Sequence, residues 1–292
     1  MLVFQAHQGA ALRVVYSADA RSLYTTGLDL TIRQWQATGY SGRLIGSRAP
    51  GTTSALAHLT TPDRLIAGGP SHGLAMWSVA SASATPMSFR ALQINDLCID
   101  PAGQEVATAN CDPHSDPHIL LWSLRETRPP HRLWSHRLPI NVLCYSPDGR
   151  WLVSGCQDGV VTIGDRRTPG PPRSLTLGMP IRGLCFAADT NLLVVASGSQ
   201  LVQLDPMHWI RHRVVSGPTA DIAALAADPT GRLLATGSRD GSVVVWDAQS
   251  LAVLSQFPTQ IGWVWSVTFS PDGLTLAAAG SEGRVCIVDV DP

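Results

Sequence analysis

Short runs of apolar residues alternate with small polar turns along the whole chain, and the runs recur at a nearly constant interval. The clearest run is SVVVWD at residues 242–247. Apolar stretches of this length, bounded by Gly, Asp and Pro, predict short β-strands. Six other stretches correspond to it in turn: TIRQWQ, GLAMWS, HILLWS, VVTIGD, QLVQLD and RVCIVD.

The interval between these runs identifies a repeated unit. Successive positions equivalent to Trp246 are separated by 42, 45, 42, 40, 42 and 42 residues. A period of this size that persists along a whole chain indicates a repeat architecture. The seven equivalent positions are Trp35, Trp77, Trp122, Gly164, Leu204, Trp246 and Val288.

Each repeat predicts four strands. Upstream of the run lies a second motif, such as VLCYSPDGR at residues 142–150, which predicts a strand followed by a tight turn. Pro sets φ in such a turn, Asp bonds back to the backbone, and Gly accepts a positive φ. Another apolar strand follows, as at residues 151–155, and a weaker strand closes the unit, as at residues 251–257. Four short strands in about 40 residues predict one blade of a β-propeller.

The two ends of the chain predict how the ring closes. The chain begins with MLVF, a strand of the closing type, and stops just after VCIVDV, a third strand. The first residues would then complete the seventh blade and leave no open sheet edge. We therefore expect an all-β fold: a seven-bladed β-propeller of four-stranded antiparallel blades, forming a single domain over residues 1–292.

With these motifs the sequence resembles the WD-repeat β-propeller family over essentially its full length. The resemblance implies a polar network in each blade: a His before the first strand, a Ser or Thr in the second, an Asp in the next turn, and the Trp. Blade one matches fully, blade six lacks the His, and blade four has Gly164 in place of the Trp. The implied network residues are His7, Thr26, Asp29 and Trp35 in blade one, Ser154 and Asp158 in blade four, and Thr236, Asp240 and Trp246 in blade six.

The resemblance also implies where binding occurs. In this family the turns between second and third strands lie on the top face, around the central channel, where peptides commonly bind. We expect a non-catalytic interaction scaffold, because rigid blades hold the loops still and little entropy is lost on binding. Trp263, just before the first strand of blade seven, is a candidate anchor. The expected partner-binding residues are Leu28, His72, His114, Gln157, Arg239 and Trp263.

The stretch NCDPHSDPH at residues 110–118 supports an alternative function. Two His and a Cys thiolate suit tetrahedral zinc, with an Asp or water as the fourth ligand, so Cys111, His114 and His118 would make a metal-binding or hydrolytic propeller. Two successive Asp-Pro-His triplets are also turn formers, and no second half-site is present. We favour a surface loop and expect no metal and no cofactor.

Composition narrows the classes of partner. Hydrophobic residues make up 45% and charged residues 15% of the 292 residues, which is typical of a globular protein. A net charge of −1 with 6% aromatic residues argues against nucleic acid. All 21 basic residues are Arg, which excludes a phosphate-binding loop with its Lys and lysine chemistry. We expect protein or peptide partners, no nucleic acid and no membrane, with the chain either a monomeric propeller or a subunit of a larger complex.

Cysteine usage and the N-terminus bear on the compartment. Cys98, Cys144 and Cys185 occupy the same place in consecutive repeats, as small buried apolar residues do. The N-terminus lacks the basic and apolar regions of a signal peptide, and no run of about 18 apolar residues is present. We expect a cytoplasmic protein.

Two arginine-rich segments form a second possible contact surface. They flank consecutive inter-blade connections and could form a basic patch on the bottom rim that holds an acidic segment or a phosphate. A solvated rim is the favoured interpretation. The arginines are Arg125, Arg128, Arg132, Arg137, Arg166, Arg167 and Arg173.

Overall fold

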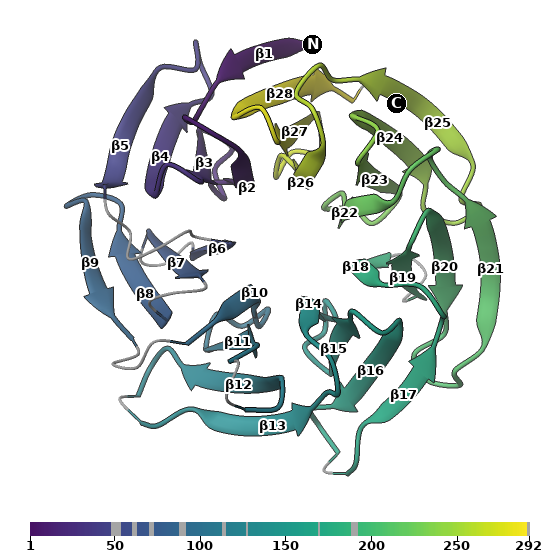
Figure 1. Ribbon diagram of the computed structural model, residues 1–292. Coiled ribbons are helices and arrows are strands. Elements are labelled where there is room, and N and C mark those ends of the chain that lie inside the picture. The colour runs from purple at the N-terminus through teal and green to yellow at the C-terminus, as the bar shows by residue number, and fades with distance from the viewer. Residues whose placement is uncertain are drawn as a thin grey trace.

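Seven four-stranded antiparallel sheets surround a central axis as the blades of a propeller (Figure 1). The described part of the chain contains no helix, and hence none long and apolar enough to cross a membrane. The all-β, seven-bladed prediction is therefore confirmed. The computed structural model describes residues 1–47, 54–59, 63–69, 73–87, 92–112, 115–126, 128–168, 170–187 and 192–290.

Within each blade the first strand lies nearest the axis and the fourth lies at the rim (Figure 1). The first strands are β2 (Ala11–Tyr16), β6 (Ala55–Leu59), β10 (Ile94–Ile99), β14 (Ile140–Tyr145), β18 (Ile181–Ala187), β22 (Ile222–Ala227) and β26 (Val264–Phe269). The second strands are β3 (Ser22–Gly27), β7 (Arg64–Gly69), β11 (Glu105–Asn110), β15 (Trp151–Cys156), β19 (Leu192–Ser197), β23 (Leu233–Ser238) and β27 (Thr275–Gly280). The third strands are β4 (Thr31–Gln36), β8 (Gly73–Ser78), β12 (His118–Ser123), β16 (Val160–Asp165), β20 (Gln200–Leu204), β24 (Ser242–Asp247) and β28 (Arg284–Asp289). The fourth strands are β5 (Gly42–Ser47), β9 (Ser83–Pro86), β13 (His131–Ser135), β17 (Arg173–Thr176), β21 (Arg211–Ser216), β25 (Val253–Pro258) and β1 (Leu2–Gln5).

The ring closes through the N-terminal strand, as predicted. β1 pairs antiparallel with β28, with Leu2 opposite Ile287 and Gln5 opposite Arg284. The same strand also contacts the next blade, because the ring of Phe4 lies 4.8 Å from that of Trp35. The closing strand thus joins blade seven to blade one through both backbone pairing and side-chain packing.

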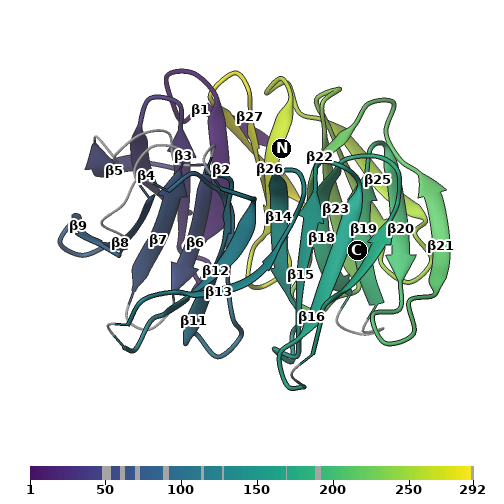
Figure 2. The same cartoon turned by 60° about the horizontal axis from the view of Figure 1, so that its bottom comes forward.

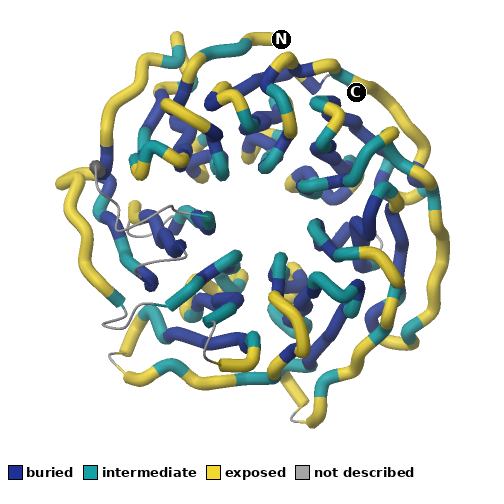
Figure 3. Tube along the Cα trace, in the orientation of Figure 1, coloured by how far each residue is buried: buried dark blue, intermediate teal, exposed yellow. Residues whose placement is uncertain are grey.

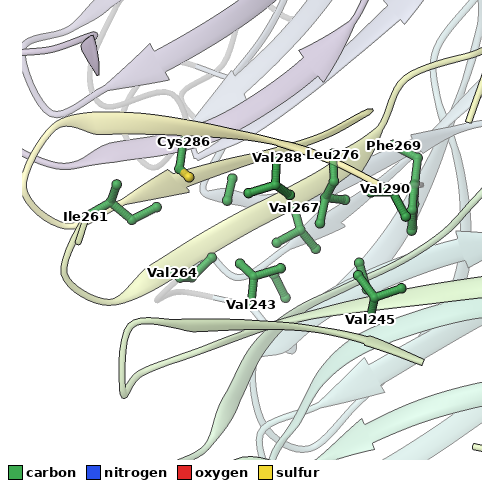
Figure 4. Close-up of a cluster of buried hydrophobic side chains, with 13 residues drawn as sticks. Val243, Val245, Ile261, Val264, Val267, Phe269, Leu276, Cys286, Val288 and Val290 are labelled. Atoms are coloured by element: carbon green, nitrogen blue, oxygen red, sulfur yellow. The ribbon is translucent and has the colours of Figure 1, made fainter. Parts of the chain in front are cut away.

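The core consists of layers between neighbouring blades rather than one central mass. Figure 4 shows the layer between blades six and seven, where Val243 and Val245 of β24 face Val264 and Val267 of β26. Inner strands are largely buried and the outer strands are exposed along the rim (Figure 3). A blade buries its apolar faces only against its neighbours, which is why the ring is needed for stability.

Candidate functional site

The top face is the end of the ring where each first strand begins and each second strand ends. In blade six, for example, Ile222 at the start of β22 lies opposite Ser238 at the end of β23. The chain entering the first strand and the turn between second and third strands therefore meet at one end of every blade. The opposite end carries the turns between first and second strands, and the two ends are separated along the strands (Figure 2).

Arg239 and Trp263, two of the predicted partner-binding residues, lie together on this face. The guanidinium carbon of Arg239 is 5.3 Å from the ring centre of Trp263 and 5.9 Å from that of Trp265, within cation–π range. The two indole rings meet edge to face at 5.6 Å. Trp263 is 48% exposed, whereas Trp side chains are highly buried on average.

Two of the other predicted contact residues, Leu28 and Gln157, lie in the turns between the second and third strands of other blades. Leu28 is 50% exposed in the corresponding turn of blade one. Gln157 occupies the turn of blade four, where its Oε1 accepts a 3.0 Å hydrogen bond from Asn141 Nδ2. His72 and His114 lie outside the described residues.

A cavity of about 390 Å³ opens along the axis and is lined mainly by residues of the first strands, among them Arg182 and Trp265. Arg13 reaches from blade one across this channel to blade three, where it pairs with Asp96 at 3.3 Å. Asp96 also accepts the backbone N–H of Leu143 at 2.8 Å. Burial raises the pKa of the Asp96 carboxyl, and Arg13 opposes that rise. This pair could not be predicted from the sequence because its members lie two blades apart.

The polar network of blade one uses Thr25, not Thr26. Trp35 Nε1 donates to Thr25 Oγ1 at 2.9 Å, and Thr25 lies 2.7 Å from His7 Nε2. His7 Nδ1 is 2.9 Å from Asp29. In the observed register Trp35 lies opposite Leu23, so the residue two beyond Leu23 shares its face, and that residue is Thr25. Thr26 therefore points to the other face of the sheet.

Blade six shows the shorter version of this network. Trp246 Nε1 donates to Thr236 Oγ1 at 2.9 Å. Asp240 accepts hydrogen bonds from the backbone and hydroxyl of Ser242 in its own turn, and from the hydroxyl of Thr219 in the segment before β22. This blade has no His before its first strand. Among the described residues, no side chain therefore connects the Trp246–Thr236 hydrogen bond to Asp240 as His7 connects Thr25 to Asp29 in blade one.

Blade four contains a network that the sequence analysis did not identify. Gly164 leaves a gap where blades one, two, three and six carry Trp. The indole of Trp134, from β13 of the preceding blade, occupies this gap, because a Cβ on Gly164 would lie 2.5 Å from Trp134 Cζ3. Trp134 Nε1 donates to Ser154 at 3.0 Å, and His136 Nε2 lies 2.8 Å from the same hydroxyl. Asp158 accepts the backbone N–H of Val160 at 3.1 Å. The WSH tripeptide at residues 134–136 is the sequence feature from which this network could have been predicted.

Two of the three residues of the possible zinc site are described, and both make other contacts. Cys111 Sγ accepts from Asn95 Nδ2 at 3.2 Å, and burial raises the pKa of its thiol, which disfavours the thiolate that binds metals. His118 Nδ1 donates to the Asp116 carbonyl at 2.8 Å. Among the described residues no group of three His, Cys, Asp or Glu is placed to hold a metal ion.

The arginine-rich rim is partly neutralised by carboxylates. Arg128 and Arg166 both pair with Glu105, at 3.7 and 3.2 Å. Arg167 pairs with Asp148 at 3.3 Å. These ion pairs reduce the positive charge that an acidic partner would encounter there and agree with a solvated rim.

The fold and its top face define the class of protein: a propeller whose blades are held by Trp-centred hydrogen bonds and whose channel opens beside exposed aromatic and basic side chains. The family described as "WD domain, G-beta repeat" matches residues 127–165, 209–247 and 252–289. Each matched segment runs from the fourth strand of one blade through the third strand of the next, so the sequence repeat is offset from the blade. Over these three segments the chain carries WD repeats, and its seven four-stranded blades agree with that match.

Several curated proteins are similar to this chain. The Protein LST8 homolog of Drosophila melanogaster is 28% identical over 260 residues, which cover 83% of this chain and 80% of that protein. The Target of rapamycin complex subunit wat1 of Schizosaccharomyces pombe is 22% identical over 234 residues, covering 76% and 73%. Telomerase protein component 1 of Mus musculus is 30% identical over 179 residues, covering 58% of this chain but only 6% of that protein.

Proposed function

We propose that this protein is a non-catalytic scaffold that binds a peptide or protein segment on its top face, around the mouth of the channel. The observation that carries the proposal is the exposed Trp263 beside Arg239, at the place where the channel opens. Trp and Arg are the residue types most enriched among those that dominate binding energy. A rigid ring holds them in place before a partner arrives, which reduces the entropy lost on binding.

The similar proteins support a role in an assembly. The fission yeast relative carries the name of a complex subunit, and the alignment extends over about three-quarters of both chains. We further propose that the chain forms one propeller domain over residues 1–292 and exists as a single ring. We also propose that it binds protein rather than nucleic acid and that it is located in the cytoplasm. The last two points rest on its net charge of −1 and on cysteines in repeated apolar positions.

The test is a quantitative affinity capture from a lysate of the source organism. The double variant Trp263→Ala, Arg239→Ala is compared with the native protein, and we expect it to lose at least about 30-fold in affinity for a captured partner, since a dominant Trp or Arg contributes about 2 kcal/mol or more. The control is Trp151→Ala, Arg150→Ala, another Trp–Arg pair (4.3 Å) that lies on the opposite face.

The two variants separate the possible sites. Loss of the partner in the top-face variant alone supports the proposal. Equal retention by both variants, or loss only in the control, would place binding at the rim or the blade edges and contradict it. If the native protein captures no partner, the alternative with Cys111, His114 and His118 is tested next, by zinc stoichiometry and His114→Ala.

A further inference from the structure

Neighbouring blades are joined at the channel mouth by a series of side-chain hydrogen bonds. Ser54 Oγ donates to the carbonyl of Ile94 in the next blade at 2.7 Å. Asn95 Nδ2 donates in the same way to Ile140 at 3.1 Å, and Asn141 Nδ2 to Ile181 at 3.0 Å. Asn95 and Asn141 occupy the extra position of a register irregularity near the start of their strands. Each donor thus fixes its blade to the first residue of the following inner strand.

This series ends at Arg182, which occupies the equivalent position in blade five. The register irregularity there lies between Ile181 and Gly183. The Nε of Arg182 is buried and has no hydrogen-bond acceptor among the described residues. Blade six carries Ala223 at this position, which has no polar side chain, and blade seven carries Trp265, whose Nε1 also lacks an acceptor. On this side of the ring the fold therefore leaves buried donors unused.

Arg239 adds a second cation at the same place. Burial lowers the pKa of Arg182, the charge of Arg239 lowers it further, and Asp221 opposes both effects. Asp221 is the acidic partner of Arg239, at a long 3.9 Å. The Nε of Arg239 is buried without an acceptor in the described residues. We name Arg182, Asp221, Arg239, Trp263 and Trp265 the mouth cluster.

The charges of the mouth cluster do not balance. The cluster contains two guanidinium groups, which stay protonated in proteins, and one carboxylate, that of Asp221, which pairs with Arg239. Asp240, next to Arg239 in sequence, directs its oxygens to Ser242 and Thr219. Arg13, also at the mouth, is already paired with Asp96. Buried polar and charged groups are expected to find partners, so the cluster is built for one additional acceptor with a single negative charge.

We propose that the mouth cluster binds the carboxylate of an Asp or Glu side chain from an acidic segment of the partner protein. This rests on the function proposed above and names the chemistry of the occupant. A guanidinium fork matches a carboxylate through two parallel hydrogen bonds. Asp221 would repel a dianionic phosphate more strongly than a monoanionic carboxylate. The exposed ring of Trp263 would pack against the residue beside the acidic one.

Two matched libraries of displayed dodecapeptides test this inference. One carries Glu at a fixed central position, and the other carries Gln there, with all remaining positions random. We expect the native protein to enrich the Glu library at least about tenfold over the Gln library. For the best peptide, either Glu→Gln in the peptide or Arg182→Gln in the protein should weaken Kd about tenfold or more.

Two further variants and one control test this interpretation. Arg239→Gln should also weaken binding, which keeps the test decisive if Arg182→Gln proves poorly folded in a thermal melt. Arg182→Lys keeps the charge without the fork and should lose less than Arg182→Gln. Arg21→Gln removes an arginine that is 85% exposed on the opposite face and should leave Kd unchanged.

The outcomes separate this inference from the proposed function. Peptides that bind the top face and lose nothing on Glu→Gln, or that bind only when phosphorylated, overturn the carboxylate inference and leave the scaffold proposal standing. Failure of both libraries to yield a peptide sensitive to the Trp263→Ala, Arg239→Ala variant contradicts both proposals.

Discussion

Individual hydrogen-bonded side chains stabilise the blades by satisfying buried polar groups. In blade one, the indole N–H of Trp35 donates to Thr25, and the Thr25 hydroxyl lies against His7, which contacts Asp29. If His7 Nδ1 donates to the Asp29 carboxylate, His7 Nε2 accepts the hydrogen bond of the Thr25 hydroxyl. Every polar group of this four-residue network then has a partner. His7 and His136 are both buried, and burial lowers the pKa of each imidazole.

These histidines predict a loss of stability at mildly acidic pH. The folded-state pKa lies below the usual 6.5, so the unfolded chain takes up protons that the folded chain resists. The stabilisation is complete above about pH 6.5 and is lost as the pH falls from there toward the folded-state value, by at most about 1.4 kcal/mol per pH unit for each His. Urea unfolding at pH 7.5 and 5.5 should show the decrease.

The variant His136→Gln isolates one of the two contributions. It removes a titrating group, so its free energy of unfolding should change less between the two pH values than that of the native protein. An equally large change in both proteins would show that His136 does not contribute to the pH dependence.

At the scale of strands, neighbouring blades complement one another. Blade four has Gly164 at the Trp position, and Trp134 from the outer strand of blade three fills that space and bonds to Ser154. In blade one the Trp is local, yet its ring also contacts Phe4 of the closing strand. The layer between two blades is therefore the packing unit, and a residue missing from one strand can be replaced from the strand across the layer.

This complementarity predicts that Gly164 and Trp134 are coupled. Gly164→Ala places a Cβ against the indole of Trp134 and should cost about 1–3 kcal/mol, as overpacking in a core does. In a Trp134→Ala background the same substitution should cost less than about 0.5 kcal/mol, because the opposing ring is gone. Chemical denaturation of the four proteins in this double-mutant cycle measures the coupling.

Gly170→Ala is the matched control, since a Cβ there meets no atom within 4 Å. It should be neutral or slightly stabilising. Equal costs of Gly164→Ala with and without Trp134 would show that the indole does not occupy the gap.

For the whole molecule, closure of the ring joins the two ends of the sequence. β1 is the fourth strand of a blade whose other three strands come from the C-terminal end of the chain. Without it, β28 would present an unpaired edge, and Trp35 would lose the contact with Phe4. Free strand edges favour self-association, so closure affects solubility as well as stability.

Replacing residues 1–5 with a Gly-Ser linker of equal length should therefore lower the melting temperature by about 5 °C or more, given about 2–4 °C per kcal/mol lost in a large domain. It should also shift the protein toward larger species in size-exclusion chromatography. Leu2→Ser, a single change at a side chain that is 44% exposed, should do neither. An unchanged melt for the linker variant would mean that closure does not contribute to stability.

The sequence by itself determined the number of blades, the place of most strands and the closing strand. Those features depend on apolar runs and turn residues, which are local properties of the chain, and on their recurrence about every 42 residues. All of these can be read along the sequence without knowing which strands pack together. Only the tertiary structure decided that Thr25 and not Thr26 faces Trp35, that Trp134 replaces a missing Trp, and that the charges of Arg182 and Arg239 come within electrostatic range of each other. Each of these depends on strand register or on contacts between blades, and residues 30 to 57 positions apart in sequence become neighbours only when the ring has formed.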